Sequence, residues 1–305
     1  MPDDLREEFD KLNKAFKVEI LREEELKMHT SFKVGGPADF FIRVFDIDGL
    51  KATIKLLKRN AVKYFILGNG SNLLVSDKGY RGAVIKLAGD FLKLKLRDNI
   101  LISGAGLMLS ALCRKALEEE LTGLEFAYGI PGSVGGGIVM NAGAYGGELK
   151  DVVSEVTLLN SEGEIVKKTV EEMHFGYRSS ILRQEDYVVL EASFLLNKGD
   201  KTLIKEKMDD LMGRRLAKQP LEFPSGGSTF KRPEGYFAGK LIEDAGLKGF
   251  SIGGAGVSKK HAGFVINYKE ASASEINEVI KEVQKKVFET SGIKLETEII
   301  KIGEF

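Results

Sequence analysis

The feature that most restricts the fold of this chain is a segment of 22 residues, 126–147, that contains no charged side chain and lies between Glu125 and Glu148. Its length suits a membrane helix, but it holds eight glycines and Pro131. Each interior glycine weakens a helix by about 1 kcal/mol and an interior proline by about 3 kcal/mol. We therefore expect irregular structure here, with the main chain shaped around a ligand.

The peptide groups of such a segment suit phosphate. Glycine lets the main chain approach a ligand closely and adopt positive φ, and successive inward-pointing N–H groups form a concave nest for phosphate oxygens. A second segment, GNGSNLLV at 68–75, follows a β-rich run and also lacks Lys and Arg. Two such segments predict a diphosphate ligand. The alternative, tight turns between strands, explains either segment alone equally well but explains the pair less well.

The standard nucleotide-binding motifs are absent. A Rossmann G-x-G-x-x-G fails at Leu73, which stands where the third glycine would follow Gly68 and Gly70. The nearest approach to a Walker A loop, at 235–241, is one residue too short and ends in Leu241 instead of the Ser or Thr that ligates magnesium. A dinucleotide is therefore expected to bind through another architecture.

Composition excludes several classes of function. Lys plus Arg is 45 and Asp plus Glu is 45, so the net charge is zero and offers no field for gathering nucleic acid or an anionic membrane. The single Cys113, expected in the core, excludes an intrachain disulfide, and three scattered histidines give no metal-ligand spacing. The N-terminus lacks the pattern of a secretory signal, and no stretch of about 20 apolar residues is present. We expect a cytoplasmic protein that binds no nucleic acid, membrane or metal.

A length of 305 residues predicts two or three domains of mixed helices and strands, an α+β organisation. Apolar spacing predicts helices at the N-terminus, where Leu5, Phe9, Leu12 and Phe16 share one stripe, and at 48–60, 107–121, 201–218 and 239–245. A last helix opens with a Ser272 and Glu275 capping box. Strands are predicted at 38–45, 64–67, 82–87, 92–96, 99–106, 187–196, 250–253, 263–268 and 294–303, with a hairpin over 152–170 that turns at 160–163.

Eight motifs resemble a known family in order and over nearly the whole chain. They are HTSFKVGGPADF, LGNGSNLLVSD, GIPGSVGGGIVMNAGAYGG, FGYRSS, GGSTFKRP, FAGKLIEDAGLKG, VSKKHAGFVIN and LETEII. This pattern resembles the UDP-N-acetylenolpyruvoylglucosamine reductase (MurB) family. The short chain between FGYRSS and the strand at 187–196 is similar to the compact branch of that family, which lacks an extra loop with a substrate-clamping tyrosine.

The resemblance implies a two-part FAD-binding fold of the vanillyl-alcohol-oxidase (PCMH) type, followed by a C-terminal α+β substrate domain. The implied boundaries are 1–87 and 88–205 for the two FAD-binding subdomains and 206–294 for the substrate domain, with the strand at 295–305 returning to the first subdomain. It further implies a noncovalent FAD that is reduced by NADPH as co-substrate and then reduces UDP-N-acetylglucosamine enolpyruvate to UDP-N-acetylmuramate for peptidoglycan synthesis. We expect a cytoplasmic monomer with roles in cell-wall biogenesis, cell shape, cell cycle and cell division.

The resemblance also assigns site residues. Its catalytic residues fall on Ser228 as proton donor, Arg178 and Glu298. Its cofactor-binding positions fall on Gly68, Asn69, Gly70, Ser71, Asn72, Gly129, Pro131, Gly132, Ser133, Gly135, Gly136, Asn141 and Gly143. Its substrate-binding positions fall on Lys218 and Arg232, for the diphosphate of the UDP-sugar, and on His261.

The catalytic residue types suit this chemistry. Arg178 is permanently charged and can bind a carboxylate through two N–H groups as an enolate develops. An ionised Glu298 would repel that enolate, so we expect it to be protonated, or to orient Arg178 or a water. Without the resemblance, simpler roles remain open: a turn hydroxyl for Ser228, a surface ion pair with Glu185 or Asp186 for Arg178, and an outward-facing strand residue for Glu298.

Two other functions remain compatible with the sequence. One is an oxidase on the same flavin-binding fold, which would pass electrons to oxygen. The other is a catalytically silent UDP-sugar-binding protein, which would be colourless when purified.

Overall fold

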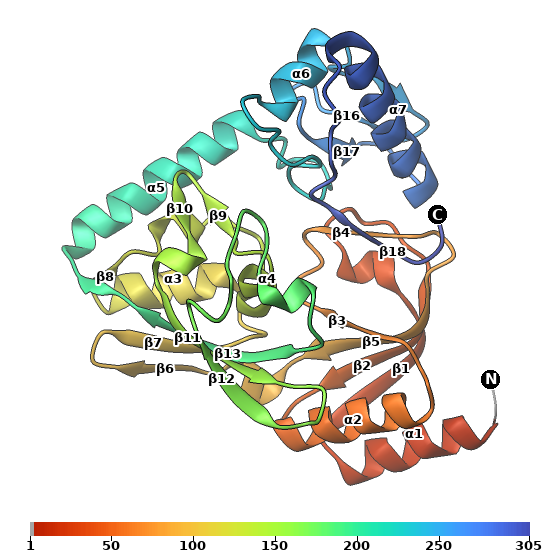
Figure 1. Cartoon of the computed structure of the whole chain (residues 1–305), viewed down its shortest axis with the longest axis vertical. Coiled ribbons are helices and arrows are strands. Elements are labelled where there is room, and N and C mark those ends of the chain that lie inside the picture. The colour runs from red at the N-terminus through yellow and green to blue at the C-terminus, as the bar shows by residue number, and fades with distance from the viewer. Residues whose placement is uncertain (1–2) are drawn as a thin grey trace. The chain divides into compact units, whose positions relative to one another are not determined.

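The computed structural model describes the chain from residue 3 to residue 305 and its side chains from residue 7 onward (Figure 1). The chain forms two compact units. Unit 1 comprises the chain up to Arg22 together with Phe40–Asn69 and Gly82–Gly213, and unit 2 comprises Glu23–Asp39, Gly70–Arg81 and Arg214–Phe305. Each unit therefore combines segments that are far apart in sequence.

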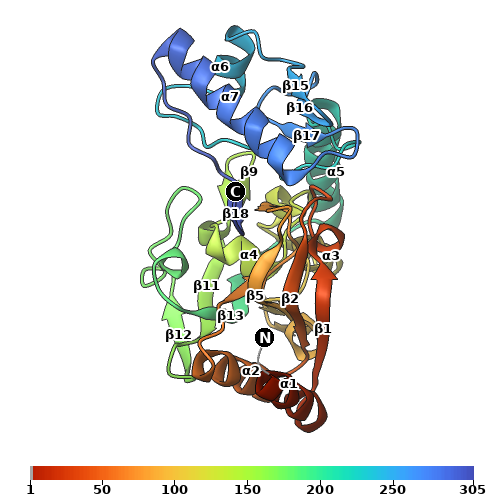
Figure 2. The ribbon, with the colours of Figure 1, turned by 90° about the vertical axis from the view of Figure 1, so that its right-hand side faces the viewer.

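The first sheet belongs mostly to unit 1 and has the strand order β1-β2-β5-β3. Its strands are β1 Val18–Glu25, β2 Pro37–Val44, β3 Tyr64–Leu67 and β5 Tyr80–Leu87. β3 runs parallel to β5, and the connection between them, which contains β4 Leu73–Val75, provides the crossover that parallel strands need. Helices α1 Asp3–Ala15 and α2 Ile47–Arg59 lie side by side against this sheet (Figure 2).

The N-terminal apolar stripe is confirmed in part. Phe9 and Leu12 are buried, and the Phe9 ring packs 4.1 Å from that of Phe40 between centroids. Phe16, however, lies one residue beyond the end of α1 and is 40% exposed, so the prediction that it belongs to this helical stripe was wrong. The side chain of Leu5 lies outside the described residues.

The second sheet of unit 1 is antiparallel, with the order β12-β11-β13-β7-β6. Its strands are β6 Leu94–Arg97, β7 Ile100–Gly104, β11 Val153–Leu159, β12 Ile165–Thr169 and β13 Val188–Leu195. The predicted hairpin turn is confirmed, because the Asn160 carbonyl accepts the Gly163 N–H at 3.1 Å. The neighbouring helices are α3 Leu109–Glu118, α4 Val134–Val139 and α5 Lys201–Lys218, the last of which runs on into unit 2 residues.

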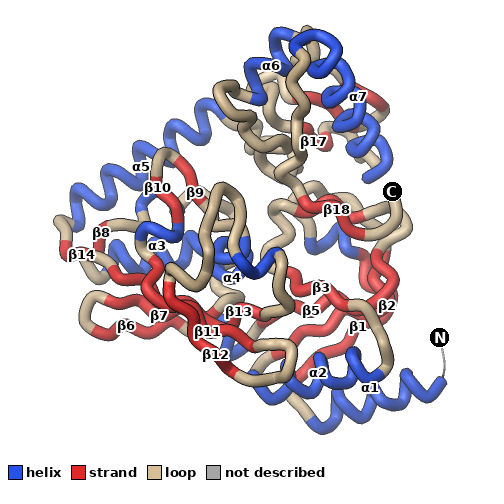
Figure 3. The backbone as a smooth tube through the Cα atoms, viewed as in Figure 1, coloured by secondary structure: helices blue, strands red, loops and turns tan. Residues whose placement is uncertain are grey.

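Short elements complete unit 1. They are the strand pairs β8 Leu121–Thr122 with β14 Asn197–Lys198 and β9 Gly143–Ala144 with β10 Gly147–Glu148, and the 3₁₀ turns Gly89–Leu92, Glu125–Ala127, Leu149–Asp151 and Ile181–Arg183. Much of the chain around α4 is loop (Figure 3).

Unit 2 contains a small antiparallel sheet of β15 Ser251–Ile252, β16 Ala255–Val257 and β17 Val265–Asn267, with helices α6 Ala238–Asp244 and α7 Ala273–Ser291. The predicted capping box of α7 is confirmed: the Ser272 hydroxyl accepts the Glu275 N–H, and the Glu275 carboxylate accepts the Ser272 N–H. A 3₁₀ turn, Leu26–His29, also lies in this unit.

The end of the chain is less regular than the predicted strand at 294–303. Only β18 Ile300–Ile302 is a strand, and it runs parallel to β4 Leu73–Val75. Just before it, residues 296–298 pair with 229–231 through a separate antiparallel bridge. In place of the one predicted strand, the chain forms two short paired stretches, one with residues 229–231 and one with β4. Among the described helices, none is long and apolar enough to cross a membrane.

The uncharged glycine segment is partly helical, so the expectation of wholly irregular structure was wrong for the six residues of α4. Two contacts explain the helix. Ser133 caps it by accepting the Gly136 N–H at 3.2 Å, and Gly135 packs so closely that an added Cβ would lie 3.0 Å from the Ala105 Cβ. Burial against the core thus outweighs the low helix propensity of glycine.

We expect two neighbouring glycines of α4 to respond oppositely to substitution by alanine. Gly135→Ala places a methyl group against Ala105, and such overpacking costs about 1–3 kcal/mol in the free energy of unfolding. Gly136 is exposed and an added Cβ meets only the Ser133 Oγ, at 3.3 Å, so Gly136→Ala should be neutral or stabilise by up to about 1 kcal/mol. Urea denaturation followed by circular dichroism measures both, and equal effects would contradict the packing explanation.

Candidate active site

The two glycine-rich segments meet in unit 1. The Asn69 side-chain amide donates to the Pro131 carbonyl at 2.7 Å. An added Cβ on Gly68 would lie only 2.6 Å from the Ser133 Oγ, so the main chain at Gly68 directly abuts the start of α4. Residues 68–69 and 131–133 therefore form one continuous surface, as a shared diphosphate site requires.

The hydrogen bonds of the second segment show which amides remain for a ligand. The Val134 and Gly135 N–H groups donate to the carbonyls of Leu107 and Ala105, at 2.7 and 2.8 Å, and the Gly136 N–H donates to Ser133. The start of α4 is thus satisfied within the protein. Over the described part of the chain, no acceptor is recorded for these N–H groups: Gly68, Asn69, Gly129, Gly132 and Ser133.

These five N–H groups are better placed to bind the phosphates of a cofactor than the N-terminus of α4 is, because the N–H groups there are already bonded within the protein. They lie on both segments, they carry no neighbouring acidic side chain within the uncharged run, and glycine at three of the five positions lets a ligand approach the main chain. The surface can therefore bind phosphate oxygens without a lysine or an arginine.

The rest of the first segment belongs to unit 2. Gly70 has φ +64°, and an added Cβ would lie 2.0 Å from the His29 carbonyl oxygen, so only glycine fits here. The Asn72 side-chain amide donates to the Glu298 carbonyl at 3.1 Å, and the Asn72 carbonyl accepts the Ile300 N–H. Asn72 therefore ties the first segment to the end of the chain.

Ser228 and Glu298 lie on adjacent extended segments of unit 2. The Glu298 N–H donates at 2.9 Å to the carbonyl of Thr229, the residue after Ser228. Thr229 is fully buried and its hydroxyl accepts the Val265 N–H, which fixes these segments to β17. Pairing of two segments that are far apart in sequence thus brings together Ser228 and Glu298, which no local pattern connects.

The surroundings of Ser228 argue against the alternative that its hydroxyl only stabilises a turn. Ser228 is exposed, and no hydrogen bond of its hydroxyl is recorded in the described structure. It follows Gly227, which has φ +78°. Glu298 is partly buried, whereas Glu296 is exposed and pairs with Lys231 at 3.0 Å. The two glutamates of the LETE motif therefore have different environments.

Arg178 sits at the tip of a tight turn in unit 1. Gly176 and Ser179 exchange two main-chain hydrogen bonds, and Arg178 between them has φ +51°. Its guanidinium donates to the Gly143 carbonyl at 3.0 Å and lies 5.1 Å from the centre of the Tyr177 ring. Asp186, one of the two expected surface partners, is bound by Lys58 and Tyr64.

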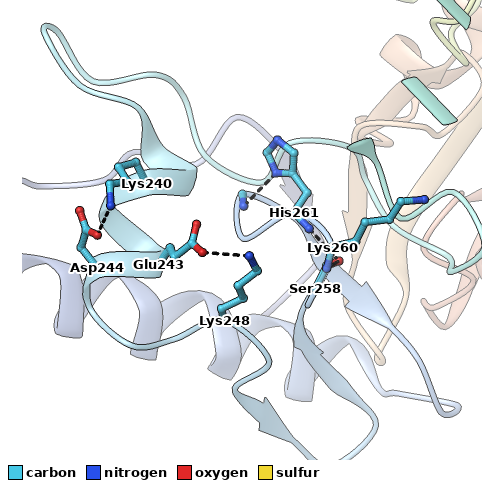
Figure 4. Close-up of polar contacts among 8 residues, drawn as sticks. Lys240, Glu243, Asp244, Lys248, Ser258, Lys260 and His261 are labelled. Atoms are coloured by element: carbon cyan, nitrogen blue, oxygen red, sulfur yellow. Dashed lines mark hydrogen bonds and ion pairs between the residues drawn. The ribbon is translucent and has the colours of Figure 1, made fainter. Parts of the chain in front are cut away.

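The three residues expected to bind the substrate all belong to unit 2. Lys218 is exposed at the end of α5, and the Arg232 guanidinium stacks 4.0 Å from the centre of the Phe237 ring. The His261 Nδ1 accepts the Gly263 N–H at 3.1 Å (Figure 4). Burial, together with the positive charges of Lys248 and Lys218, lowers the pKa of His261. The charge of Lys218 thus acts on His261, and the Arg232 Nε donates to the Tyr236 carbonyl at 3.3 Å.

The expected burial of Cys113 in the core is confirmed. Cys113 is buried, and burial together with the nearby Glu125 carboxylate raises the pKa of its thiol to about 12, so it is not a reactive thiol. Among the described residues, no group of three or more His, Cys, Asp or Glu could hold a metal ion.

Sequence reasoning missed Glu125, which it treated only as the border of the uncharged segment. Glu125 is 3% exposed and accepts hydrogen bonds from the Thr122 hydroxyl and the Gly123 N–H, and Lys207 lies 3.3 Å away. Burial alone would raise its pKa, but these hydrogen bonds outweigh burial and the pKa is lowered. The T-x-x-E spacing of Thr122 and Glu125, typical of a capping box, was the available signal.

We expect His261 to titrate below its ordinary pKa of 6.5 in the folded protein. At pH values between the lowered pKa and 6.5, His261 binds more protons in the unfolded chain than in the folded protein. The free energy of unfolding therefore increases as pH rises through this range and decreases as pH falls. The His261→Asn variant keeps an acceptor for the Gly263 N–H and should lose less stability between about pH 7 and about pH 5. Histidine ring NMR and thermal unfolding at several pH values measure both effects, and a ring pKa above 6.5 would disprove them.

Comparison with known proteins identifies the family. A family model described as FAD binding domain matches residues 38–169, and one described as UDP-N-acetylenolpyruvoylglucosamine reductase, C-terminal domain, matches residues 219–302. Curated proteins named UDP-N-acetylenolpyruvoylglucosamine reductase are 52% identical in Alkaliphilus oremlandii, over 93% of this chain and 94% of that protein, and 48% identical in Clostridioides difficile, over 96% of both.

A solved structure agrees with this result. The crystal structure of UDP-N-acetylenolpyruvylglucosamine reductase (MurB) from Thermus caldophilus superimposes with a TM-score of 0.81 at 35% identity, over 94% of this chain and 99% of that chain. The predicted fold class, a two-part FAD-binding fold with a C-terminal α+β domain, is confirmed. The chain belongs to the UDP-N-acetylenolpyruvoylglucosamine reductase family.

Proposed function

This protein is an FAD-dependent oxidoreductase, and we propose that it uses NADPH to reduce UDP-N-acetylglucosamine enolpyruvate to UDP-N-acetylmuramate. The observation that carries the proposal is the junction of the two glycine-rich segments, where Asn69 bonds to Pro131 and five amides are left for phosphate oxygens. Membership of the reductase family supports the same substrate.

In this proposal the FAD diphosphate is held mainly by main-chain N–H groups of residues 68–69 and 129–133. The positions assigned to the cofactor are Gly68, Asn69, Gly70, Ser71, Asn72, Gly129, Pro131, Gly132, Ser133, Gly135, Gly136, Asn141 and Gly143. When bound, FAD supplies the hydride that no side chain can donate.

Arg178 binds the carboxylate of the enolpyruvyl group and stabilises the negative charge that develops toward it. One such preorganised donor is worth about 2.7–4 kcal/mol in the transition state. The bond from Arg178 to the Gly143 carbonyl supports this role, because it restricts the position of the guanidinium.

Ser228 gives its hydroxyl proton to the carbon next to the one that accepts hydride. The exposure of Ser228 and the absence of a recorded hydrogen bond of its hydroxyl in the described structure support this role, because the hydroxyl is available to substrate. Glu298 either donates a hydrogen bond in protonated form, so that it does not repel the enolate, or orients Arg178 or a water. Lys218 and Arg232 bind the diphosphate of the UDP-sugar, and His261 lies in a loop that faces the substrate.

We further propose that the protein works as a monomer in the cytoplasm and serves cell-wall biogenesis, cell shape, the cell cycle and cell division. The division into 1–87, 88–205 and 206–294, with residues 295–305 returning to the first part, is the functional partition that we propose. Pairing of β18 with β4 supports the return of the last strand.

The purified protein should be yellow, and anaerobic NADPH should bleach its flavin absorbance. Addition of the enolpyruvyl UDP-sugar without oxygen should restore the colour. An oxidase would instead regain its colour only with oxygen, and a silent sugar-binding protein would be colourless. Stopped-flow absorbance of the two half-reactions measures each outcome.

We expect Ser228→Ala to leave flavin reduction by NADPH within about 3-fold of wild type and to slow reoxidation by the sugar by about 10²–10⁴-fold, the usual contribution of a positioned proton donor. Ser251→Ala, at another exposed serine of unit 2, is the matched control and should change neither rate. Equal slowing of both half-reactions would exclude Ser228 as the proton donor.

A further inference from the structure

Asn141, which lies inside the uncharged segment just after α4, is the most completely bonded polar side chain of that segment. It is fully buried, with φ +42°. Its Nδ2 donates to the Glu148 carboxylate at 2.9 Å and to the Gly176 carbonyl at 3.0 Å, and its Oδ1 accepts the Lys150 N–H at 3.0 Å. Both amide N–H groups are therefore used within unit 1, and no donor is left for a ligand.

The Gly176 carbonyl that Asn141 holds belongs to the turn that carries Arg178. This carbonyl also accepts the Ser179 N–H at 3.3 Å, which closes the turn. Arg178 occupies its third position with φ +51°, a conformation that glycine or asparagine adopts much more readily than arginine. The turn is thus strained at Arg178, and a strained turn keeps its shape only when its surroundings fix it.

Two hydrogen bonds with residues near the end of α4 fix the turn at 176–179. Asn141 binds the residue two positions before Arg178, and the Ser180 hydroxyl, two positions after it, donates to the Val139 carbonyl at 2.8 Å. Ser180 is 2% exposed, so neither bond competes with bulk water. Residues 139 and 141 therefore hold both sides of the turn.

The same asparagine also organises the surface on which the Arg178 guanidinium rests. Glu148, its carboxylate partner, lies in β10 opposite Gly143 of β9, and the Gly143 carbonyl accepts from Arg178. Lys150 binds Glu148 at 2.9 Å. Burial would raise the pKa of Glu148, but hydrogen bonds from Lys150 and Asn141 and the charges of Lys150 and Arg178 outweigh it and lower that pKa. A carboxylate that stays ionised keeps the acceptor that Asn141 needs.

We propose that Asn141 is a positioning residue, which fixes the strained turn at 176–179 and the β9–β10 hairpin so that the Arg178 guanidinium is held ready for the substrate carboxylate. This inference rests on the proposed function of Arg178. It gives the Asn141 side chain a role other than contact with the flavin, because a bond to the flavin would require breaking one of its two N–H bonds. Small displacements of a positioned group can cost about 10²-fold in rate.

The test uses Asn141→Asp in the flavin-loaded protein. The aspartate keeps the acceptor for the Lys150 N–H but loses the two donors to Gly176 and Glu148. We expect reoxidation of the reduced flavin by the enolpyruvyl UDP-sugar to slow by about 10–10²-fold, while reduction by NADPH changes by less than about 3-fold. The matched control is Asn160→Asp, whose asparagine makes the same kind of bonds with Glu164 in the exposed hairpin at 160–163 and should leave both rates unchanged.

The affinity for FAD distinguishes a positioning role of Asn141 from direct contact between its side chain and the flavin. Fluorescence titration of the flavin-free protein with FAD should give a Kd for Asn141→Asp within about 3-fold of wild type, whereas loss of a hydrogen bond to the flavin would weaken it by about 10-fold or more. If Asn141→Asp does not fold, Asn141→Gly provides the same comparison, because glycine tolerates positive φ and adds no charge. Loss of flavin binding in both variants would overturn the inference.

A double-mutant cycle shows whether Asn141 acts through Arg178. Arg178→Lys alone should slow reoxidation, and adding Asn141→Asp should slow it by less than about 3-fold further, since the group being positioned is already altered. Multiplicative effects of the two substitutions would overturn the inference. If the wild-type flavin is not reoxidised by the enolpyruvyl sugar, the proposed function itself fails; if it is and Asn141→Asp matches wild type, only the role of Asn141 fails.

Discussion

Main-chain hydrogen bonding within residues 126–147 determines what this part of the molecule can bind. A buried N–H group without an acceptor costs about 1–3 kcal/mol, so an uncharged segment can enter the core only if its peptide groups find partners. The carbonyls of Leu107 and Ala105 accept the N–H groups at the start of α4. Before the helix, the amides at 129 and 132–133 remain open, and the ligand surface beside Asn69 is therefore a loop and not a helix N-terminus.

Glycine serves different physical purposes at neighbouring positions of this surface. At Gly70 the main chain has positive φ and lies against the His29 carbonyl, so any side chain would clash. At Gly135 the conformation is helical, and the absent Cβ leaves room for Ala105. Gly136 is exposed and meets neither constraint. A high local glycine content thus indicates a special main chain without saying which glycines face a ligand.

The polar groups around Arg178 show how a reactive geometry is kept in place. An arginine with positive φ is strained by about 1–3 kcal/mol, and the buried bonds of Asn141 and Ser180 offset that cost locally. Asn72 performs a comparable task in unit 2, where its side chain holds the Glu298 carbonyl. In both places the short amide side chain of an asparagine fixes the main chain of a neighbouring segment. Asparagine suits this task because its amide can donate and accept hydrogen bonds at the same time.

The sequence by itself determined the elements whose signals are local: the capped helix α7, the hairpin that turns at 160–163, and the motifs that identify the family. It failed at β1, whose charged residues are tolerated because β1 is an edge strand, and at α4, where burial overrides glycine propensity. Only the tertiary structure decided which amides stay open, that Ser228 lies beside the segment of Glu298, and that Asn141 holds the Arg178 turn. The physical reason is that hydrogen-bond partners far apart in sequence are chosen by packing, which no local pattern of side chains records.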